Sequence, residues 1–191
     1  MATTPQVVLD FWFAESAAAQ WFGASAEFDA QIRERFGETA QAAADGALDD
    51  WAGAPAGWLA LLLLLDQFPR NLHRNDPRAW AQDVKAQRVA LSGIAQGFDR
   101  QLPPIQRVFA YLPLEHAEDT ALQQQSVDLF EQLCADAAAD QRQRFEEFLD
   151  YARRHREVIA RFGRFPHRNA ALGRVDTPAE QQYLAQPGAG F

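Results

Sequence analysis

Apolar residues recur every three or four positions along most of the chain, which is the spacing of one face of an α-helix. The clearest example runs over residues 140–162 and predicts an amphipathic helix that buries one side. One member of its apolar stripe is a histidine, and Gly163 follows as a suitable C-terminal stop. The stripe consists of Phe145, Phe148, Leu149, Ala152, His155, Ile159 and Phe162.

Small polar residues and prolines mark the starts of the predicted helices, because both favour the first turn. The segment Thr177-Pro178 with Glu180 is typical of a capping box, in which the cap and the third helical residue bond to each other's backbone. We expect helices to begin at or just after Thr4, Ser25, Pro55, Asp76, Pro103, Glu115, Asp140 and Thr177.

The segment Trp58–Leu65 is apolar on every side, which indicates a helix at the centre of the core. Pro69 is expected to stop this helix, so that residues 66–75 form a loop. In the same way Pro113 is expected to end a short helix, with a new one starting at Glu115. The helix after Asp76 is expected to bury Trp80, Val84, Leu91 and Ile94.

No segment alternates between apolar and polar residues over the length of a strand, and no Asn-Gly or Asp-Gly hairpin turn occurs. The sequence therefore predicts an all-α fold with about eight helices arranged as antiparallel pairs. We find no low-complexity linker, and 191 residues with 48% hydrophobic content suit one core. We expect residues 1–191 to form a single all-helical domain.

Cysteine use and the apolar runs predict a cytoplasmic protein. Cys134 is the single cysteine and cannot form an internal disulfide, which suits a reducing compartment. The N-terminal segment lacks the basic region and cleavage site of a secretory signal. The longest apolar run, Trp58–Leu65, is far shorter than the roughly 20 residues of a membrane-spanning helix. We therefore expect no membrane partner.

The formal net charge is −8, but positive charge is concentrated in two parts of the chain. Residues 61–114 carry seven bases against four acids, and residues 140–174 carry nine against five. An acidic protein of this kind is unlike a general nucleic-acid binder, whose surface is basic. The pattern instead favours a local site for a small anion.

The segment FGRFPHRNAALGR, residues 162–174, places three arginines and His167 within thirteen residues. Arg164, Arg168 and Arg174 each present a planar set of donors suited to a carboxylate or a phosphate. Alternatively, these arginines pair with acids of the chain itself in a structural network. The acids considered for that role are Asp66, Glu115, Glu118 and Asp119.

A shorter version of the motif, DQFPRN, occupies residues 66–71. Asp66 follows a buried helix, where the helix dipole disfavours negative charge, so it needs a donor such as Arg70. This pair either fixes the chain to the core or supplies a functional acid, and Asn71 can bond backbone groups nearby.

The motif LPLEHAED, residues 112–119, offers an acid and base combination. If a helix starts at Glu115, then Glu115 and Asp119 are four residues apart on one face, with His116 beside them. The acids could simply stabilise the helix N-terminus. Alternatively, His116 and a carboxylate form a general acid/base pair. No HExxH pattern supports a metal site, so we expect neither metal nor cofactor.

Other chemistry has less support in the sequence. His155 lies on an apolar stripe, which favours a hydrogen-bonded core histidine over a ligand, with a carboxylate or carbonyl of a neighbouring helix as its partner. The patterns GxxxxGK[ST], GxSxG and CxxC are absent, so ATPase, serine-hydrolase and dithiol chemistry are not indicated.

The segments LDQFPRN (65–71), LPLEHAED (112–119) and GRFPHRNAALGR (163–174) together resemble the bacterial family known as domain of unknown function 924. VLDFWF (8–13) and DTPAEQQYL (176–184) extend the resemblance over essentially the whole chain. The resemblance implies an all-α fold related to tetratricopeptide-repeat proteins, although no clean repeat is evident in the sequence. It implies no activity.

Three functions are compatible with these patterns. The leading hypothesis is binding of a small anionic molecule or peptide carboxylate in a pocket lined by Arg, His and Asp. The alternatives are a hydrolase or transferase acting on a phosphate or carboxylate ester, and a peptide-binding scaffold in which the polar motifs form a structural network. The expected ligand-binding residues are Asp66, Arg70, Asn71, Asp119, Arg164, Arg168, Asn169 and Arg174, and the candidate catalytic residues are Glu115, His116 and His167.

Overall fold

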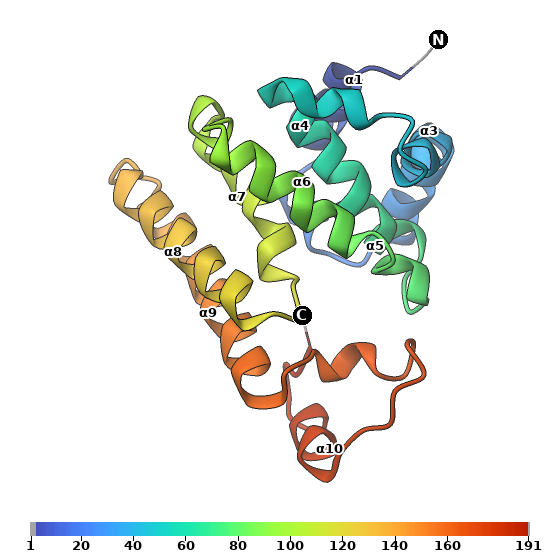
Figure 1. Ribbon diagram of the computed structural model, residues 1–191, viewed down its shortest axis with the longest axis vertical. Coiled ribbons are helices and arrows are strands. Elements are labelled where there is room, and N and C mark those ends of the chain that lie inside the picture. The colour runs from blue at the N-terminus through green and yellow to red at the C-terminus, as the bar shows by residue number, and fades with distance from the viewer. Residues whose placement is uncertain (1–2, 191) are drawn as a thin grey trace. The chain divides into compact units, whose positions relative to one another are not determined.

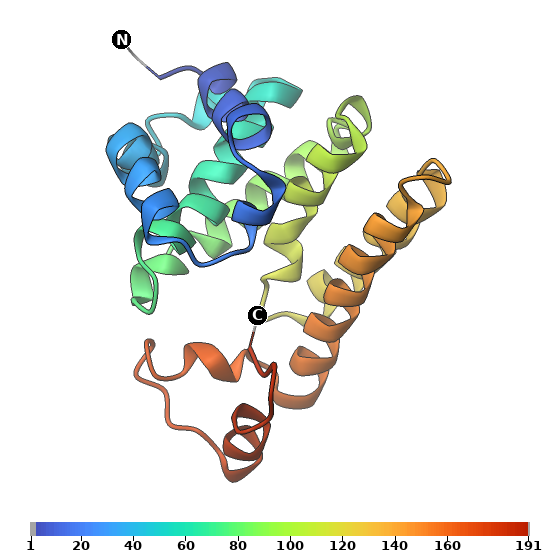
Figure 2. The ribbon, with the colours of Figure 1, turned by 180° about the vertical axis from the view of Figure 1, so that it is seen from behind.

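The computed structural model describes residues 3–190, and Figures 1 and 2 show them from opposite sides. These residues form two compact units, each of which we describe by itself. The first unit comprises residues 3–74 and 78–113, and the second comprises residues 75–77 and 114–190. The described residues form helices and turns without a strand, which confirms the all-α prediction. The expectation of a single domain stays a prediction.

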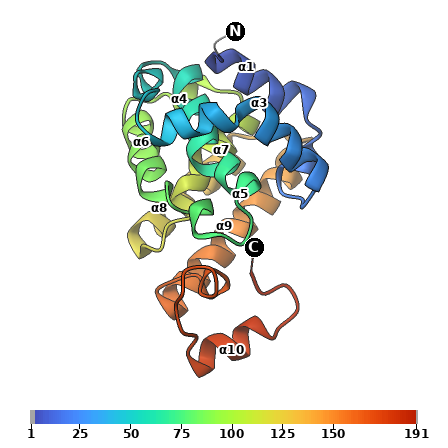
Figure 3. The same ribbon diagram turned by 90° about the vertical axis from the view of Figure 1, so that its right-hand side faces the viewer.

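The first unit is built from short and medium helices separated by turns (Figure 3). Its N-terminal part consists of α1 (Pro5–Asp10), α2 (Ala18–Trp21) and α3 (Ala26–Ala44). They are followed by α4 (Pro55–Leu62), α5 (Phe68–Leu72), α6 (Asp83–Ala95) and α7 (Pro104–Glu115), whose last two residues belong to the second unit. Thr4 and Ser25 accept hydrogen bonds at the starts of α1 and α3, as their sequence positions predict.

The core of the first unit is centred on Trp58–Leu65, and every side chain of this segment has a relative exposure of 0%. α4 contacts both α1 and α6. An aromatic cluster adds to this core, and Phe11 and Phe68 lie at its centre with their ring centroids 6.3 Å apart. Burying each such side chain contributes about 1.5–3 kcal/mol. The complete burial of Trp58–Leu65 confirms the prediction of a central apolar helix.

Pro69 does not stop the helix, contrary to the sequence prediction. Residues 63–67 form a π-helical turn in which the N–H of Phe68 donates to the carbonyl of Leu63, and α5 continues directly from it. Pro69 therefore lies in the first turn of α5, where its missing N–H costs no helical hydrogen bond. The expected loop over residues 66–75 is helical as far as Leu72.

Pro113 likewise lies inside a helix, because α7 continues through it to Glu115. The next helix, α8 (Thr120–Asp136), begins after Asp119, whose carboxylate accepts hydrogen bonds from the N–H groups of Ala121 and Leu122. The prediction that Glu115 and Asp119 share one helical face is therefore wrong. The cap at Asp119 sets the start of α8 at Thr120, five residues later than expected.

The helix expected after Asp76 also starts later and turns a different face to the core. Residues 77–79 form a 3₁₀ turn, α6 begins at Asp83, and Val84 is 63% exposed. The buried face of α6 consists of Ala86, Ala90 and Gly93. A Cβ atom at Gly93 would overlap the indole of Trp58, so the small residues on α6 make room for that ring.

The second unit is organised around α8 and α9 (Arg142–Phe162), which lie side by side in Figures 1 and 2. Two cross-pairs define their direction: Arg153 donates to Glu131 at 2.8 Å, and Arg156 donates to Gln124 at 3.0 Å. The partner moves back along α8 as the arginine moves forward along α9, so the helices are antiparallel. This agrees with the predicted helical pairing.

The chain after α9 turns sharply and then forms a 3₁₀ turn, Pro166–Arg168, and α10 (Pro178–Leu184). Gly163 ends α9 in the left-handed conformation with φ 69°, as the sequence predicts. The capping box of Thr177 and Glu180 is also confirmed. Phe165 packs with Val158 and Ile159 in a small core, which places the residues after Gly163 against α9.

No helix among residues 3–190 is long and apolar enough to cross a membrane. Of the C-terminal segment QPGAGF, residues 186–190 are described and Phe191 lies outside the described residues.

Candidate functional site

The second unit contains a group of polar side chains around the ring of Phe165, which we call the histidine cluster. Its members are Glu115, His116, His155, His167 and Arg168. Phe165 is fully buried, and its ring centroid lies 5.5 Å from that of His155 and 5.6 Å from that of His167. The rings of His116 and His155 lie 6.1 Å apart. The turn at Gly163 and the 3₁₀ turn that follows bring His167 and Arg168 back toward α9.

His155 contacts a carboxylate at the end of α7, as the sequence predicts for a core histidine, and also a carbonyl of its own helix α9. Its Nδ1 lies 2.8 Å from the carbonyl oxygen of Tyr151 and 3.1 Å from Oε1 of Glu115. The Tyr151 carbonyl can only accept, so Nδ1 carries the proton and donates. Both side chains are almost completely buried, with relative exposures of 4% for His155 and 3% for Glu115.

The ring of His155 is neutral near pH 7. Burial lowers its pKa well below the ordinary value, and the nearby His116, Arg168 and His167 lower it further, against an opposing hydrogen bond to the Tyr151 carbonyl. The contact with Glu115 is therefore a hydrogen bond rather than an ion pair. Since Nδ1 carries the single proton, Nε2 is the basic nitrogen of this ring.

Arg168 supplies the permanent positive charge of the histidine cluster. Its side chain is buried, with 5% relative exposure for the residue, and its Nη2 donates to the carbonyl oxygen of His116 at 3.1 Å. The guanidinium carbon lies 4.5 Å from the centroid of the Phe165 ring. Phe165 thus contacts the guanidinium through a cation–π interaction while His155 and His167 flank the same ring.

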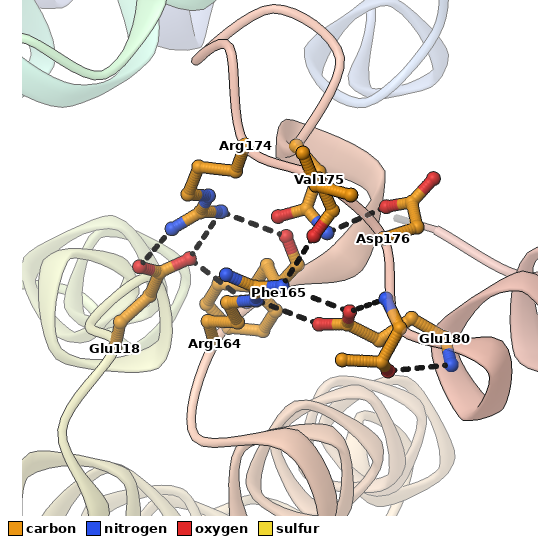
Figure 4. A network of polar contacts seen from close by, with 9 residues as sticks. Glu118, Arg164, Phe165, Arg174, Val175, Asp176 and Glu180 are labelled. Carbon is orange, nitrogen blue, oxygen red and sulfur yellow. Dashed lines mark hydrogen bonds and ion pairs between the residues drawn. The ribbon is translucent and has the colours of Figure 1, made fainter.

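The other two arginines of the motif bind carboxylates (Figure 4). Arg164 forms a two-fold contact with Glu180, with Nε to Oε1 at 2.6 Å and Nη2 to Oε2 at 2.9 Å. Arg174 forms a similar contact with Glu118, at 2.7 and 3.0 Å. We call these four residues the arginine–carboxylate network. Bidentate contacts of this kind fix geometry as well as contribute energy.

Charge pairing changes the proton affinity of both acids in the network. The hydrogen bond from Arg164 is the main cause that lowers the pKa of Glu180 far below its ordinary value, and the N–H of Thr177 adds to it. Burial alone would raise the pKa of Glu118, but hydrogen bonds from Arg174 and the Phe165 N–H outweigh it and lower that pKa. Both carboxylates are therefore charged partners at neutral pH.

Asn169 follows the histidine cluster and binds a carboxylate seven residues further along the chain. Asn169 is 0% exposed, and its Nδ2 donates to Asp176 at 2.6 Å. Its Oδ1 is buried and has no hydrogen-bond partner among the described residues. A buried amide oxygen of this kind costs free energy, which makes the loop a place where a water or ligand donor would be favourable.

The motif DQFPRN lies in the first unit, and its polar side chains pair there. Arg70 contacts Asp66 at 3.2 Å and Asp83 at 3.1 Å. Burial would lower the pKa of Arg70, but the two carboxylates outweigh burial and raise it. Asn71 donates to Asp29 at 2.8 Å, and Arg74 contacts the same carboxylate. Asp66 is 1% exposed, so the pair with Arg70 fits the structural interpretation.

Some of the predicted site residues thus lie together and others do not. Glu115, His116, His167 and Arg168 meet in the histidine cluster, whereas Asp119 serves as the cap of α8. Glu118 was foreseen as an arginine partner, but Glu180, Asp83 and Asp29 were not. The capping box was a local sequence signal that could have drawn attention to Glu180. Asp83 lies 13 residues from its partner Arg70, and Asp29 lies 42 residues from its partner Asn71, so no local sequence pattern indicates either pair.

No group of three or more His, Cys, Asp or Glu side chains within residues 3–190 is placed to hold a metal ion. The histidine cluster instead combines hydrogen-bond donors, one buried carboxylate and one neutral histidine. Such a set can bind an anion and can move a proton.

The comparisons with known proteins identify a family but give no function. Residues 8–188 match the family model described as "Bacterial protein of unknown function (DUF924)". The chain is 40% identical to a protein of unknown function from Agrobacterium tumefaciens whose structure is solved, with a TM-score of 0.85. The match covers 95% of this chain and 96% of that chain. A search of curated proteins found no match. The relation to tetratricopeptide repeats stays a prediction.

Proposed function

The chain belongs to the DUF924 family, whose description gives no function, and we propose that it binds a small anionic molecule at the histidine cluster of the second unit. The observation that carries the proposal is the composition of the cluster. It gathers one guanidinium and three imidazoles around a single buried carboxylate, in a protein of net charge −8. A permanently charged guanidinium and the ring nitrogens of three imidazoles supply hydrogen-bond donors, which favours an anionic ligand.

The chemistry of the donors indicates a phosphate or a carboxylate as the bound group. Arg168 offers a planar set of N–H donors that matches either anion. His116 and His167 are half-buried, whereas Glu115, His155 and Arg168 are buried, so these two histidines are the more accessible residues of the cluster. Arg164 and Arg174 serve a different purpose under this proposal, because their bidentate contacts with Glu180 and Glu118 hold the loop that carries Arg168.

The four histidines of the chain allow a direct test by NMR. Three belong to the histidine cluster and the fourth, His73, lies in the first unit and serves as an internal control. Titration of the full chain with inorganic phosphate should shift the ring signals of His116 and His167 saturably while His73 stays constant. If all four signals move in parallel, or none of the three cluster signals saturates, the proposal is wrong.

Single substitutions test whether the anion binds at the histidine cluster. Arg168→Ala should weaken phosphate binding by about tenfold or more, since a hydrogen bond to a charged group contributes about 1.5–3 kcal/mol. Because Arg168 is buried and its loss could unfold the chain, His167→Gln at a half-buried position is the second variant and should weaken binding as well. Arg156→Ala is the control, because Arg156 contacts Gln124 on α8 instead. Equal affinity in all variants would contradict the proposal.

A second candidate function is ester hydrolysis or transfer, and the geometry of His155 favours it over other reactions. Glu115 and the Tyr151 carbonyl orient the ring through Nδ1, and Nε2 is its basic nitrogen, as a general base requires. Hydrolysis of p-nitrophenyl phosphate and p-nitrophenyl acetate should then be detectable. His155→Gln should lower kcat by about 10²–10⁴-fold with little change in KM. An unchanged rate in a folded variant would eliminate this candidate.

The scaffold hypothesis is supported only in part. Arg70, Arg164 and Arg174 bind acids of the chain itself, which is the structural role that this hypothesis assigns to them. We therefore place these three arginines in the framework of the protein and leave Arg168 with the histidines as the proposed anion site.

A further inference from the structure

A groove runs along α9 on residues that the proposed anion site does not use. It is lined by side chains of α9, by Tyr183 of α10 and by residues 186–189 of the C-terminal segment. Its volume is about 310 Å³, at the lower end of the range for sites that bind small molecules. We call it the α9 groove. The α9 side chains that line it are Arg154, Glu157, Val158, Arg161 and Phe162.

Two aromatic rings form the apolar part of the α9 groove. The rings of Phe162 and Tyr183 lie 5.3 Å apart at an interplanar angle of 50°, and both side chains are half-buried. Both rings pack against the small core of Val158, Ile159 and Phe165, and this packing fixes their positions. The exposed parts of these two rings therefore form a preformed apolar surface for a flat apolar group.

Arg161 gives the α9 groove a cationic edge. Its guanidinium carbon lies 4.6 Å from the centroid of the Phe162 ring, and the residue is exposed. Within residues 3–190 it forms no hydrogen bond or ion pair with another side chain. Glu157 lines the same groove one turn earlier and offsets part of the charge of Arg154 and Arg161, which leaves the lining with a net charge of +1. The guanidinium donors of Arg161 therefore remain available to a ligand.

We propose that the α9 groove binds a small aromatic carboxylate. The carboxylate would accept a bidentate contact from Arg161, and the aromatic ring would lie against Phe162 and Tyr183. A ligand of the α9 groove needs an aromatic ring to contact Phe162 and Tyr183. The histidine cluster differs, because it offers hydrogen-bond donors around the single buried ring of Phe165. A carboxylate is favoured over a larger anion because one guanidinium supplies the contact and Glu157 repels further negative charge.

The three tyrosines of the chain provide a site-specific measurement with benzoate as the probe. Tyr183 lines the α9 groove, Tyr151 is exposed earlier on α9, and Tyr111 is buried in the first unit. In the full chain labelled with ¹³C-tyrosine, benzoate should shift the Tyr183 ring signal saturably and leave Tyr111 constant. Acetate should bind about tenfold more weakly, because it lacks the ring. Equal affinities for acetate and benzoate, or no saturable shift at Tyr183, would overturn the proposal.

Matched variants on the same helix assign the contact. Arg161→Ala removes an exposed side chain at the end of α9 and should abolish the saturable shift while the protein stays folded. Arg153→Ala is the control, since Arg153 is also exposed on α9 but contacts Glu131 on α8. It should bind benzoate like the wild type. If Arg161→Ala retains full affinity, or if both variants lose it equally, the site does not lie in the α9 groove. The histidine signals report separately on the anion site, so either proposal can fail alone.

Discussion

Glu180 shows how one side chain joins local and long-range structure in the second unit. Its carboxylate accepts the N–H of Thr177 within its own capping box and also binds Arg164, which lies 16 residues earlier. The same carboxylate thus caps α10 and fixes the turn that follows α9. A glutamate in this position needs its negative charge for both contacts, so its protonation should affect the stability of the protein.

We predict a pH-dependent loss of stability that depends on Glu180. Its folded-state pKa is lowered, so the stabilisation is complete above the pKa of an unfolded glutamate, about 4.3, and is lost as the pH falls through the lower folded-state pKa. Glu180→Gln should lower the Tm at pH 7 by about 3 °C or more and should lose less stability than the wild type between pH 5 and pH 2. Circular dichroism melts at several pH values measure both effects.

The control for this prediction is Glu157→Gln on the exposed side of α9. Its Tm profile should run parallel to that of the wild type. The prediction is contradicted if the Glu180→Gln profile has the wild-type shape in acid, since the Arg164 contact would then contribute nothing that depends on charge. Glu118 also has a lowered pKa and remains in all three proteins, so some acid sensitivity is expected in each of them.

At the level of elements, the helix signals that depend on near neighbours were reliable. Thr4, Ser25 and Thr177 cap the helices that they were expected to cap, and Gly163 ends α9. The apolar run Trp58–Leu65 is buried as predicted. Each of these features is decided within a few residues of the chain, by a cap, a turn or a continuous apolar surface.

The two prolines were misread because their effect depends on structure that the local pattern does not contain. The π-helical turn before Pro69 shifts the hydrogen bonding by one residue, so the proline falls in a first turn. Pro113 is held in α7 among residues that are buried almost without exception on both sides of it, and packing of this kind can offset the cost of about 3 kcal/mol. The π-helical turn thus accounts for Pro69, and burial of the surrounding helix accounts for Pro113.

The candidate site was predictable by residue type but not by partner. Grouping His116, His167 and Arg168 required only that two polar motifs lie in one region, and the structure places them around Phe165. The pairing of Arg164 with Glu180 instead of with Glu115 or Asp119 depends on how the chain folds back after Gly163. The spacing of residues along the sequence cannot specify which carboxylate the chain brings to Arg164 when it folds back.

For the molecule as a whole, the sequence predicts one domain, and the five tryptophans allow this to be tested. All five lie in the first unit, so tryptophan fluorescence reports unfolding of that unit only. His155 lies in the second unit, and its NMR signal reports unfolding there. α7 supplies residues to both units, Pro104–Pro113 to the first and Leu114–Glu115 to the second. The tryptophans are Trp12, Trp21, Trp51, Trp58 and Trp80.

A substitution in the second unit should therefore shift both signals if the chain unfolds as a single domain. Gly163→Ala is suitable because Gly163 has φ 69°, and its Cβ would meet no atom within 4 Å, so the cost comes from the backbone alone. That cost is about 1–2 kcal/mol, which corresponds to a decrease in Tm of about 3–6 °C. We expect the tryptophan and His155 transitions to coincide in the wild type and to decrease together in the variant. A lower His155 midpoint with an unchanged tryptophan midpoint would mean that the units unfold independently, and the chain would then comprise two domains.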